Sequence, residues 1–332
     1  MDSIQYMSTI LAPFEPQVPT EDLVEQLNRF YHAREAAVYD DLHPEIHNDL
    51  LPVWEHMLEM GLPEKPGRQL RMLDFGCGTG FEAGLLTKAN WAAHIAELVC
   101  YDLSPEMIDV CRESLKGSPI PIEFTTDLKT LFDRERPFDV LITNTLLHHL
   151  TDPLATIESL KPILADDVIW LAGHEPSSRF YKNEQCWKTL EEYQQTRKYQ
   201  KYVTPSKYVG ALRRMLNPDK DPAEGTAREA LRAGLVNKKL SREIIHRAVD
   251  CQVPHSPEEA QSGRGLDWAE MEKELAGRWE LLWKRSYNFM GPYLADELPE
   301  KWRLLSRQLQ ECHPDDGASF CSIWRRMPDS NG

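Results

Sequence analysis

A short run of glycines between an apolar segment and a helical one is the stretch of this sequence best suited to chemistry. Residues 72–81 read Met-Leu-Asp-Phe-Gly-Cys-Gly-Thr-Gly-Phe. Because glycine has no Cβ, such a turn bends tightly and lets a ligand approach its backbone. Asp102 ends a second apolar run about 20 residues further on, the distance at which a carboxylate can bind ribose hydroxyls in a Rossmann-like unit. We therefore expect a nucleotide-type ligand here, with Asp102 as its ribose acceptor.

Three ligands compete for a turn of this kind. A phosphate-binding P-loop needs a lysine and a hydroxyl residue after its glycines, and Phe81 follows Gly80 instead. The dinucleotide fingerprint needs glycine at the sixth position, which is again Phe81. Asp74, at the mouth of the turn, repels a pyrophosphate but suits a ligand that carries an ammonium and a sulfonium. S-adenosylmethionine (SAM) is such a ligand, and a NAD-binding turn of an oxidoreductase is the alternative.

The segment around these glycines resembles the first motif of class I SAM-dependent methyltransferases. The resemblance covers roughly 65–175 and 266–326 and is loose elsewhere. It implies a Rossmann-like, doubly wound α/β fold with a seven-stranded, mostly parallel sheet, an antiparallel C-terminal hairpin and a helical cap insertion. It also implies SAM as the cofactor, bound in this motif by Asp74, Gly76, Cys77, Gly78 and Gly80.

Later segments resemble further cofactor-binding motifs of the same family. Residues 98–103 match the ribose-binding strand, and 126–128 resemble the motif that contacts adenine. Residues 138–153 are similar to the fourth motif of the subgroup that contains quinone-pathway methyltransferases. The Pro-Pro-Tyr type of motif found in enzymes that methylate amino groups is absent at this point, which disfavours adenine, cytosine and glutamine as acceptors. The implied cofactor contacts in these segments are Asp102, Leu103, Asp127, Leu128 and Asn144.

Methyl transfer from a sulfonium is an in-line displacement with a neutral leaving group, so it requires no metal or covalent nucleophile. The protein must align the acceptor, exclude water and, for a hydroxyl or carbon acid, remove a proton. We expect His148 either to face the methyl group or to have a structural role, and His149 to hold the helix start. His174 and Glu175 are either a base and its partner or an anchor for the insertion. No ligand spacing marks a metal site at these residues.

The strands and helices expected from apolar periodicity alternate through the central third of the chain. Such alternation predicts parallel strands with both faces covered, and ligands that bind at the carboxyl ends of the strands. The candidate residues all fall at expected strand ends. The expected strands are 70–75, 97–102, 121–125, 138–143, 167–173, 279–287 and 318–324, and the expected helices are 81–90, 105–116, 152–163, 268–275 and 299–312.

The first 64 residues are expected to form an N-terminal arm and lid helices. Residues 1–19 contain three prolines and predict a loose arm. One helix is expected from Thr20 and another over 44–61. In the family, N-terminal helices with a Tyr-Asp pair often cover the cofactor. Simple packing of an amphipathic helix on the domain is the alternative to this lid role, for which the candidates are Tyr31, Tyr39 and Asp40.

The rest of the chain is expected to divide into a SAM-binding core, 65–175 with 265–332, and a helical insertion over 176–264. The insertion holds 17 Lys and Arg against 11 Asp and Glu, a balance of +6 in a chain whose formal charge is -15. It is also rich in aromatic side chains, namely Phe180, Tyr181, Trp187, Tyr193, Tyr199, Tyr202 and Tyr208. A basic, aromatic cap would suit an anionic or carboxylated small-molecule substrate, whereas ordinary solvated helix faces would give the same composition.

The composition of the 332-residue chain excludes some classes of function and partner. Its acidity argues against nucleic-acid and membrane partners, and its seven cysteines, with no CxxC pair, indicate reduced thiols and a cytoplasmic location. No run is apolar enough to span a membrane, and no signal peptide is evident. Either a monomer or a homodimer fits. The sequence thus predicts a SAM-dependent methyltransferase for a small molecule, with a non-catalytic SAM-binding regulatory or accessory protein as the main alternative.

Overall fold

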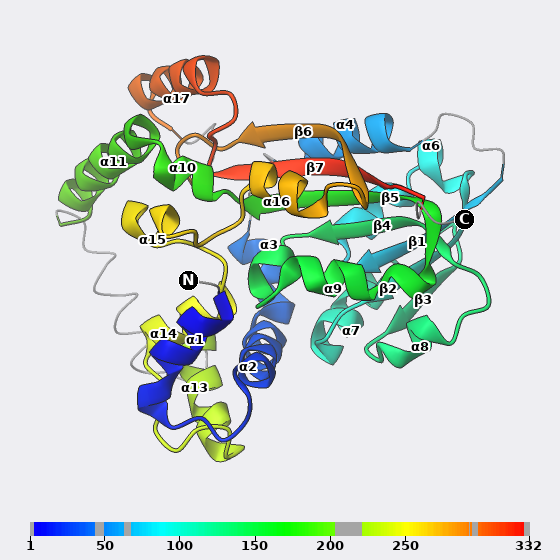
Figure 1. Cartoon of the computed structure of the whole chain (residues 1–332), viewed down its shortest axis with the longest axis horizontal. Coiled ribbons are helices and arrows are strands. Elements are labelled where there is room, and N and C mark those ends of the chain that lie inside the picture. The colour runs from blue at the N-terminus through cyan, green and yellow to red at the C-terminus, as the bar shows by residue number, and fades with distance from the viewer. Residues whose placement is uncertain are drawn as a thin grey trace. The chain divides into compact units, whose positions relative to one another are not determined.

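The computed structural model describes residues 3–43, 50–62, 68–202, 221–291, 293 and 298–328 (Figure 1). The chain forms two compact units, each assembled from segments that are distant in the sequence. Unit 1 comprises Met1–Arg34, Pro176–Leu266 and Ser286–Ser319, and unit 2 comprises Glu35–Glu175, Asp267–Arg285 and Phe320–Gly332. This division differs from the expected one because residues 1–34 and 286–319 cluster with the insertion.

Unit 2 is built on a seven-stranded sheet with the strand order β3-β2-β1-β4-β5-β7-β6 (Figure 1). Strands β1 to β5 pair in parallel, and β7 runs opposite to β5 and β6. The expected mostly parallel sheet with an antiparallel C-terminal end is therefore confirmed. The strands are β1 (Leu70–Phe75), β2 (Ile95–Tyr101), β3 (Ile122–Thr125), β4 (Phe138–Asn144), β5 (Leu164–Pro176), β6 (Trp279–Tyr287) and β7 (Ser319–Arg326).

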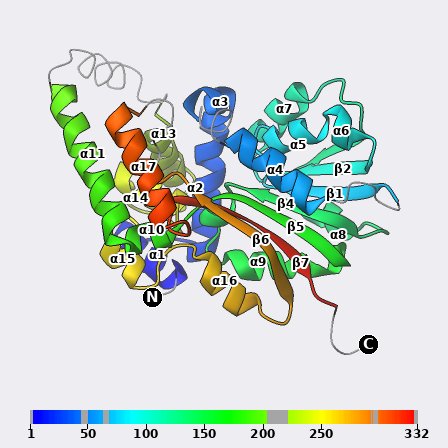
Figure 2. The ribbon, with the colours of Figure 1, turned by 90° about the horizontal axis from the view of Figure 1, so that it is seen from above.

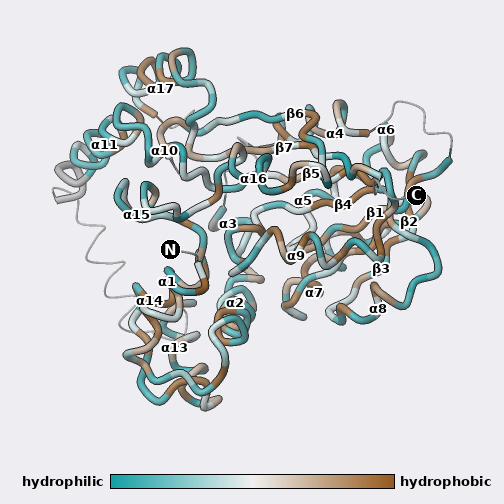
Figure 3. Tube along the Cα trace, viewed as in Figure 1, coloured by the Kyte–Doolittle hydropathy of each residue, from teal (hydrophilic) through white to brown (hydrophobic). Residues whose placement is uncertain are grey.

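The central strands are buried along nearly their whole length, because helices cover both faces of the sheet (Figure 2). Consecutive residues of β5 lie on opposite faces of the sheet. Leu171 packs toward Gly61 of α4, whereas Trp170 packs against Trp279 and Trp324. The hydropathy of the chain follows this burial, with the hydrophobic segments concentrated in the strands (Figure 3). The sheet is thus a rigid support whose strand ends can hold a site.

The helices of unit 2 follow the predicted alternation with two local differences. The helix expected over 81–90 is interrupted, because Lys88 adopts an extended backbone between α5 and α6. The helix expected over 152–163 ends early and continues as a 3-10 turn around Pro162. The helices are α3 (Tyr39–Leu42), α4 (Leu51–Gly61), α5 (Phe81–Leu86), α6 (Ala89–Ala92), α7 (Pro105–Ser114), α8 (Lys129–Phe132), α9 (Pro153–Ser159) and α16 (Trp268–Leu275).

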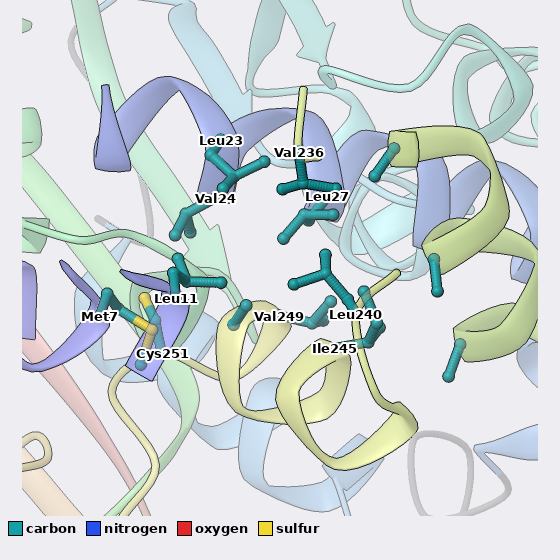
Figure 4. Close-up of a cluster of buried hydrophobic side chains, with 14 residues drawn as sticks. Met7, Leu11, Leu23, Val24, Leu27, Val236, Leu240, Ile245, Val249 and Cys251 are labelled. Carbon is teal, nitrogen blue, oxygen red and sulfur yellow. The ribbon is translucent and has the colours of Figure 1, made fainter. Parts of the chain in front are cut away.

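The expectation of a loose N-terminal arm is wrong. Residues Ser3–Leu11 form helix α1, and its apolar side chains Met7 and Leu11 are buried in the core of unit 1 (Figure 4). The prolines that suggested an arm lie beyond this helix, where they end it rather than prevent it. Met7 and Leu11 are four residues apart, so they lie on the same face of the helix and pack together into this core.

The core of unit 1 joins the N-terminal helices to the insertion. Leu23 and Leu27 of α2 (Thr20–Glu35) pack with Ile245 and Val249 of α14 in one buried cluster (Figure 4). A second cluster groups Phe180 with buried side chains of other helices of the unit. The remaining helices of unit 1 are α10 (Ser178–Lys182), α11 (Glu184–Tyr202), α13 (Pro222–Arg232), α14 (Arg242–Val249), α15 (Pro257–Gln261) and α17 (Glu300–Cys312).

Some predictions fall on residues whose structure is not described. These are the first part of the helix expected over 44–61, of which α4 is the described part, and Tyr208 of the insertion. No helix in the described part of the chain is both long and apolar enough to cross a membrane.

Candidate active site

The glycine-rich turn follows β1 and leads into α5, as the sequence predicts. Gly76, Gly78 and Gly80 have φ values of +84°, +50° and +90°, a left-handed conformation that side-chain-bearing residues rarely adopt. A Cβ on Gly76 would lie 2.7 Å from Leu146, whereas one on Gly78 would meet nothing within 4 Å. The turn is therefore packed on one side and open to a ligand at Gly78.

Asp102 is held against this turn by two backbone amides. Its carboxylate accepts hydrogen bonds from Gly78 N at 2.9 Å and Ser104 N at 2.8 Å. Burial raises the pKa of Asp102 to about 6, and these two hydrogen bonds act in the opposite direction. The carboxylate is thus placed at the end of β2, beside the open glycine, as the sequence predicts for a ribose acceptor.

Two more carboxyl groups are buried at the turn with oxygen atoms that lack hydrogen-bond partners among the described residues. Asp74 is 0% exposed, and both of its carboxylate oxygens lack a partner among the described residues. Glu82, in the first turn of α5, likewise has an unpartnered Oε1. Burial raises the pKa of Asp74 well above its usual value and that of Glu82 to about 8. Buried carboxyls that lack donors favour a cation, so the site suits the positive charges of SAM.

Glu82 was not among the residues predicted from the sequence. An acidic residue in the first turn of a helix is ordinarily explained by the helix dipole and by solvent exposure. Only the fold shows that Glu82 is 4% exposed and shares its surroundings with Asp74. No pattern in the sequence distinguishes this glutamate from a surface one.

The predicted lid residues separate in the structure. Asp40 accepts a hydrogen bond from Thr79 Oγ1 of the glycine turn at 2.8 Å, and the Tyr39 ring packs on His43 with centroids 4.4 Å apart. Tyr31 belongs to unit 1, where it packs on that unit's core. Asp40 therefore connects the N-terminal segment of unit 2 to the turn, and Tyr39 lies next to it.

The residues predicted to contact adenine lie at the end of β3. Asp127 is exposed, and its Oδ1 accepts a hydrogen bond from Lys129 N at 2.9 Å. The neighbouring Leu128 is 40% exposed, which leaves an apolar surface at this strand end. Leu103, which follows Asp102, is half-buried. The face of an adenine ring could pack on Leu128, and its exocyclic amine could donate to the Asp127 carboxylate.

Asn144 ends β4 and is tied to the helix that covers this face of the sheet. Its Oδ1 accepts a hydrogen bond from Trp54 Nε1 at 3.0 Å, and the Asn144 side chain is 7% exposed. A Cβ on Gly173 of β5 would lie 2.4 Å from the Trp54 ring. Trp54, which the sequence did not reveal, therefore fixes the amide predicted to line the methionine end of the cofactor.

The loop after β4 is organised by Glu175. This carboxylate is fully buried and accepts hydrogen bonds from the backbone amides of Leu146, Leu147 and His148. Its Oε2 also lies 2.9 Å from His148 Nδ1. Burial alone would raise the pKa of Glu175, but His148 and the backbone donors outweigh it, and the pKa lies below its usual value. Glu175 therefore orients His148 within the loop.

The two strand ends next to this loop carry strained backbone. Thr145, after β4, has a φ of +48°, and His174, in β5, has a φ of +51°. Non-glycine residues rarely hold such angles, and they are enriched at functional sites. The His149 ring packs on the His148 ring with centroids 4.0 Å apart. The structure thus pairs Glu175 with His148, whereas the sequence suggested a pairing of Glu175 with His174.

This combination of fold and site defines a class of protein. A seven-stranded sheet of this order, with a glycine-rich turn after β1 and an acid after β2, agrees with the Rossmann-like methyltransferase fold that the resemblance predicts. A family model described as a methyltransferase domain matches residues 73–169. These residues form a class I SAM-dependent methyltransferase domain.

Relatives match the same part of the chain. A ubiquinone biosynthesis O-methyltransferase of Actinobacillus pleuropneumoniae serotype 7 (strain AP76) is 29% identical over 103 residues, 29% of this chain and 42% of the relative. The enzyme of the same name from Xylella fastidiosa (strain 9a5c) is 31% identical over 96 residues, 28% of this chain and 37% of the relative. The chain thus matches only about two fifths of the length of these curated relatives.

Solved structures with a similar fold cover more of the chain at low identity. The complex between the Haloferax volcanii Trm112 methyltransferase activator and a putative methyltransferase gives a TM-score of 0.45 at 12% identity, over 90% of this chain and 98% of that chain. The plantazolicin methyltransferase BpumL in complex with a triazolic desmethylPZN analog and SAH gives a TM-score of 0.43 at 14% identity, over 93% and 100%.

Proposed function

We propose that this protein transfers a methyl group from SAM to a small-molecule acceptor. The observation that carries the proposal is the buried, unpartnered carboxylate of Asp74 beside the glycine turn. Burial already raises the pKa of this carboxyl, and the pyrophosphate of a dinucleotide would raise it further and keep the group from ionising. SAM brings an ammonium and a sulfonium instead, which compensate the buried acids of the turn.

The cofactor would be held by residues that the structure already places around the turn. Asp102 would accept hydrogen bonds from the ribose hydroxyls, and Asp127 and Leu128 would receive the adenine. Gly76, Gly78, Gly80 and Cys77 would supply the close backbone approach. Leu103, Asn144 and Tyr39 complete the predicted set. When bound, SAM supplies the electrophilic methyl group.

The proton of the acceptor would be removed by His148, with Glu175 as its positioning residue. A hydrogen bond from Nδ1–H to the Glu175 carboxylate fixes the tautomer in which Nε2 accepts a proton, and it stabilises the imidazolium that forms. His174 is the second candidate base. Glu175 would orient His148 rather than take the proton itself, because its oxygens already accept several hydrogen bonds.

The acceptor would be an anionic or carboxylated organic molecule. Support comes from the insertion, which holds 17 Lys and Arg against 11 Asp and Glu in an otherwise acidic chain. Basic side chains attract an anionic ligand, and a guanidinium binds a carboxylate in bidentate fashion.

Incubation of the purified chain with methyl-labelled SAM and a pool of small carboxylates, phenols and amines tests the proposal. We expect label to be transferred to a carboxylated acceptor, and no transfer by the Asp74→Asn variant. Tight SAM binding without transfer to any acceptor would favour the accessory-protein alternative. Calorimetric binding of NAD in place of SAM would overturn both.

The same assay assigns the base. His148→Ala should lower turnover by about 100-fold, the lower end of what general base catalysis contributes, with SAM affinity nearly unchanged. His174→Ala is tested beside it, and His149→Ala is the matched control that should retain turnover. Normal turnover of the His148 variant would move the role of base to His174.

A further inference from the structure

Three cysteines from separate elements meet beneath the glycine turn. Cys77 lies in the turn, Cys100 in β2 and Cys111 in α7, and their Sγ atoms all lie within 4.8 Å of one another. Their side chains are buried, with residue exposures of 2%, 0% and 0%. All three are free thiols.

The backbone around the three thiols is fixed by hydrogen bonds and packing. Gly76 N and Cys77 N both donate to the carbonyl of Tyr101, the residue after Cys100. A Cβ on Gly80 would lie 2.7 Å from Cys111 Sγ, so α7 packs directly against the turn. The sulfurs are therefore held close together by the same contacts that shape the cofactor turn.

This spacing matches a metal-thiolate centre. A zinc–sulfur bond is about 2.3 Å long, which places the sulfurs of a zinc site roughly 3.8–4.0 Å apart. Sulfurs that already lie within 4.8 Å of one another need only small side-chain rotations to reach that separation. Sulfur ligands select soft or borderline ions and disfavour magnesium and calcium.

We propose that Cys77, Cys100 and Cys111 form a binding site for a thiophilic divalent metal ion of the zinc and cadmium class. Binding replaces three S–H bonds by three S–metal bonds and releases three protons, so the ion and its thiolates carry one net negative charge. The site goes beyond the proposed methyl transfer, which needs no metal.

The competing explanation is that buried cysteines simply fill the core as small apolar residues. Cys321 offers the comparison, because it is also buried in unit 2 and its thiol contacts the Arg285 carbonyl. In the described part of the chain, Cys321 belongs to no group of three ligating side chains. A core-filling role predicts that Cys321 and the three clustered cysteines behave alike toward metal ions.

Titration of the reduced, chelator-treated full chain with Cd²⁺ separates the two explanations. We expect one ion per chain and an ultraviolet sulfur-to-cadmium charge-transfer band. Cys100→Ser and Cys111→Ser should each weaken binding by at least about 100-fold, because losing one of three sulfur ligands costs more than losing a side chain that only supports a ligand. Cys321→Ser should bind like the wild type. Equal affinity in the Cys111 and Cys321 variants would overturn the site.

X-ray absorption of the Zn²⁺-loaded wild type gives a second test that does not depend on the folding of a variant. We expect three sulfur neighbours at about 2.3 Å from the zinc. A first coordination sphere of nitrogen and oxygen atoms alone would overturn the proposal. Neither measurement uses SAM, so a failure of this site is distinct from a failure of the methyl-transfer proposal.

Discussion

The two units of this protein differ in how their buried charges are compensated. In unit 2, both oxygens of Asp74 and Oε1 of Glu82 lack hydrogen-bond partners among the described residues. In unit 1, the guanidinium of Arg264 is buried, with Nη2 donating to the Cys251 carbonyl and with Cζ 3.6 Å from the centroid of the Tyr6 ring. Its Nε also lies 3.8 Å from Glu259 Oε2, so this charge has a counter-charge within its own unit.

This difference indicates which buried charges are left for a ligand to compensate. A buried charge without a partner is costly, so it is expected where a ligand of opposite charge binds. In unit 2, a cationic ligand such as SAM would compensate the acids of the turn. In unit 1, Glu259 and the Tyr6 ring already compensate Arg264.

The largest effect is expected from Asp74→Asn. If Asp74 compensates a cationic group of SAM in a buried site, the substitution should weaken SAM binding by about 3–5 kcal/mol, the cost of breaking a buried charge pair. Calorimetry measures the affinity, and Asp109→Asn on the exposed face of α7 is the control that should bind normally. Unchanged affinity would show that Asp74 does not compensate a cationic group of SAM, and the proposed role of the unit 2 carboxyls would be wrong.

A smaller loss is expected from Asp102→Ala. Hydrogen bonds to a charged group contribute about 1.5–3 kcal/mol, and SAM affinity should fall by that amount. Because the same carboxylate accepts from Gly78 N, part of the loss would come from a looser turn. Asp102→Asn keeps one acceptor oxygen and should lose less. Wild-type affinity of the alanine variant would contradict the ribose contact.

The pH dependence of SAM binding follows from the acids of the turn. Asp102 accepts hydrogen bonds from the ribose hydroxyls best when it is ionised, so affinity should fall as the pH drops below about 6, where Asp102 gains a proton. With the pKa of Glu82 raised to about 8, affinity should continue to rise up to that pH. Asp102→Asn should remove the lower step. A pH-independent affinity would show that these acids do not face the cation.

Unit 1 is tested by Arg264→Met. If the guanidinium is a partnered, structural charge, the free energy of unfolding should fall by about 1–2 kcal/mol, because Glu259 and the Cys251 carbonyl lose their contacts with it. SAM affinity should stay near that of the wild type, since the cofactor turn belongs to unit 2. Arg228→Met, in an i,i+4 pair with Glu224, is the control that should change stability little. Wild-type stability of the Arg264 variant in denaturant unfolding would break the comparison.

The sequence predicted the sheet and the turn because their signals are local. Apolar runs, the glycines and Asp102 follow from neighbours a few residues apart, and β1 and β6 have the predicted bounds. The helix at Ser3–Leu11 was missed because its stability comes from burial of Met7 and Leu11 against helices far along the chain.

The site was predicted less completely, for a related reason. The sequence predicts which residues lie at the strand ends, but it does not predict which side chains from distant segments contact them. The pairing of Glu175 with His148, the Trp54 contact to Asn144 and the burial of Glu82 all depend on tertiary packing. The thiol cluster was missed too, since its cysteines are too far apart in the sequence to form a motif.

Glu175 sharpens the comparison from within unit 2. Like Asp74, it is a carboxyl with 0% exposure, yet its pKa lies below the usual value whereas that of Asp74 lies above. Burial is the same, so the difference comes from hydrogen-bond donors, which surround Glu175 and are missing at Asp74. Glu175, whose hydrogen bonds are made within the fold, therefore has a structural role, whereas Asp74 lacks such donors and would be compensated by a ligand.

The two carboxyls should therefore respond in opposite ways to the same change. Glu175→Gln keeps one acceptor oxygen for the backbone amides but loses the ionised partner of His148, so the free energy of unfolding should fall by about 1 kcal/mol while SAM affinity stays nearly intact. Because the folded-state pKa is lowered, this stabilisation is present above the usual pKa of 4.5 and is lost as the pH falls through the folded-state value. Denaturant unfolding of both variants from pH 7 to pH 3 measures it. Asp74→Asn should keep its stability and lose SAM, and a loss of SAM binding in the Glu175 variant at unchanged stability would reverse the two roles.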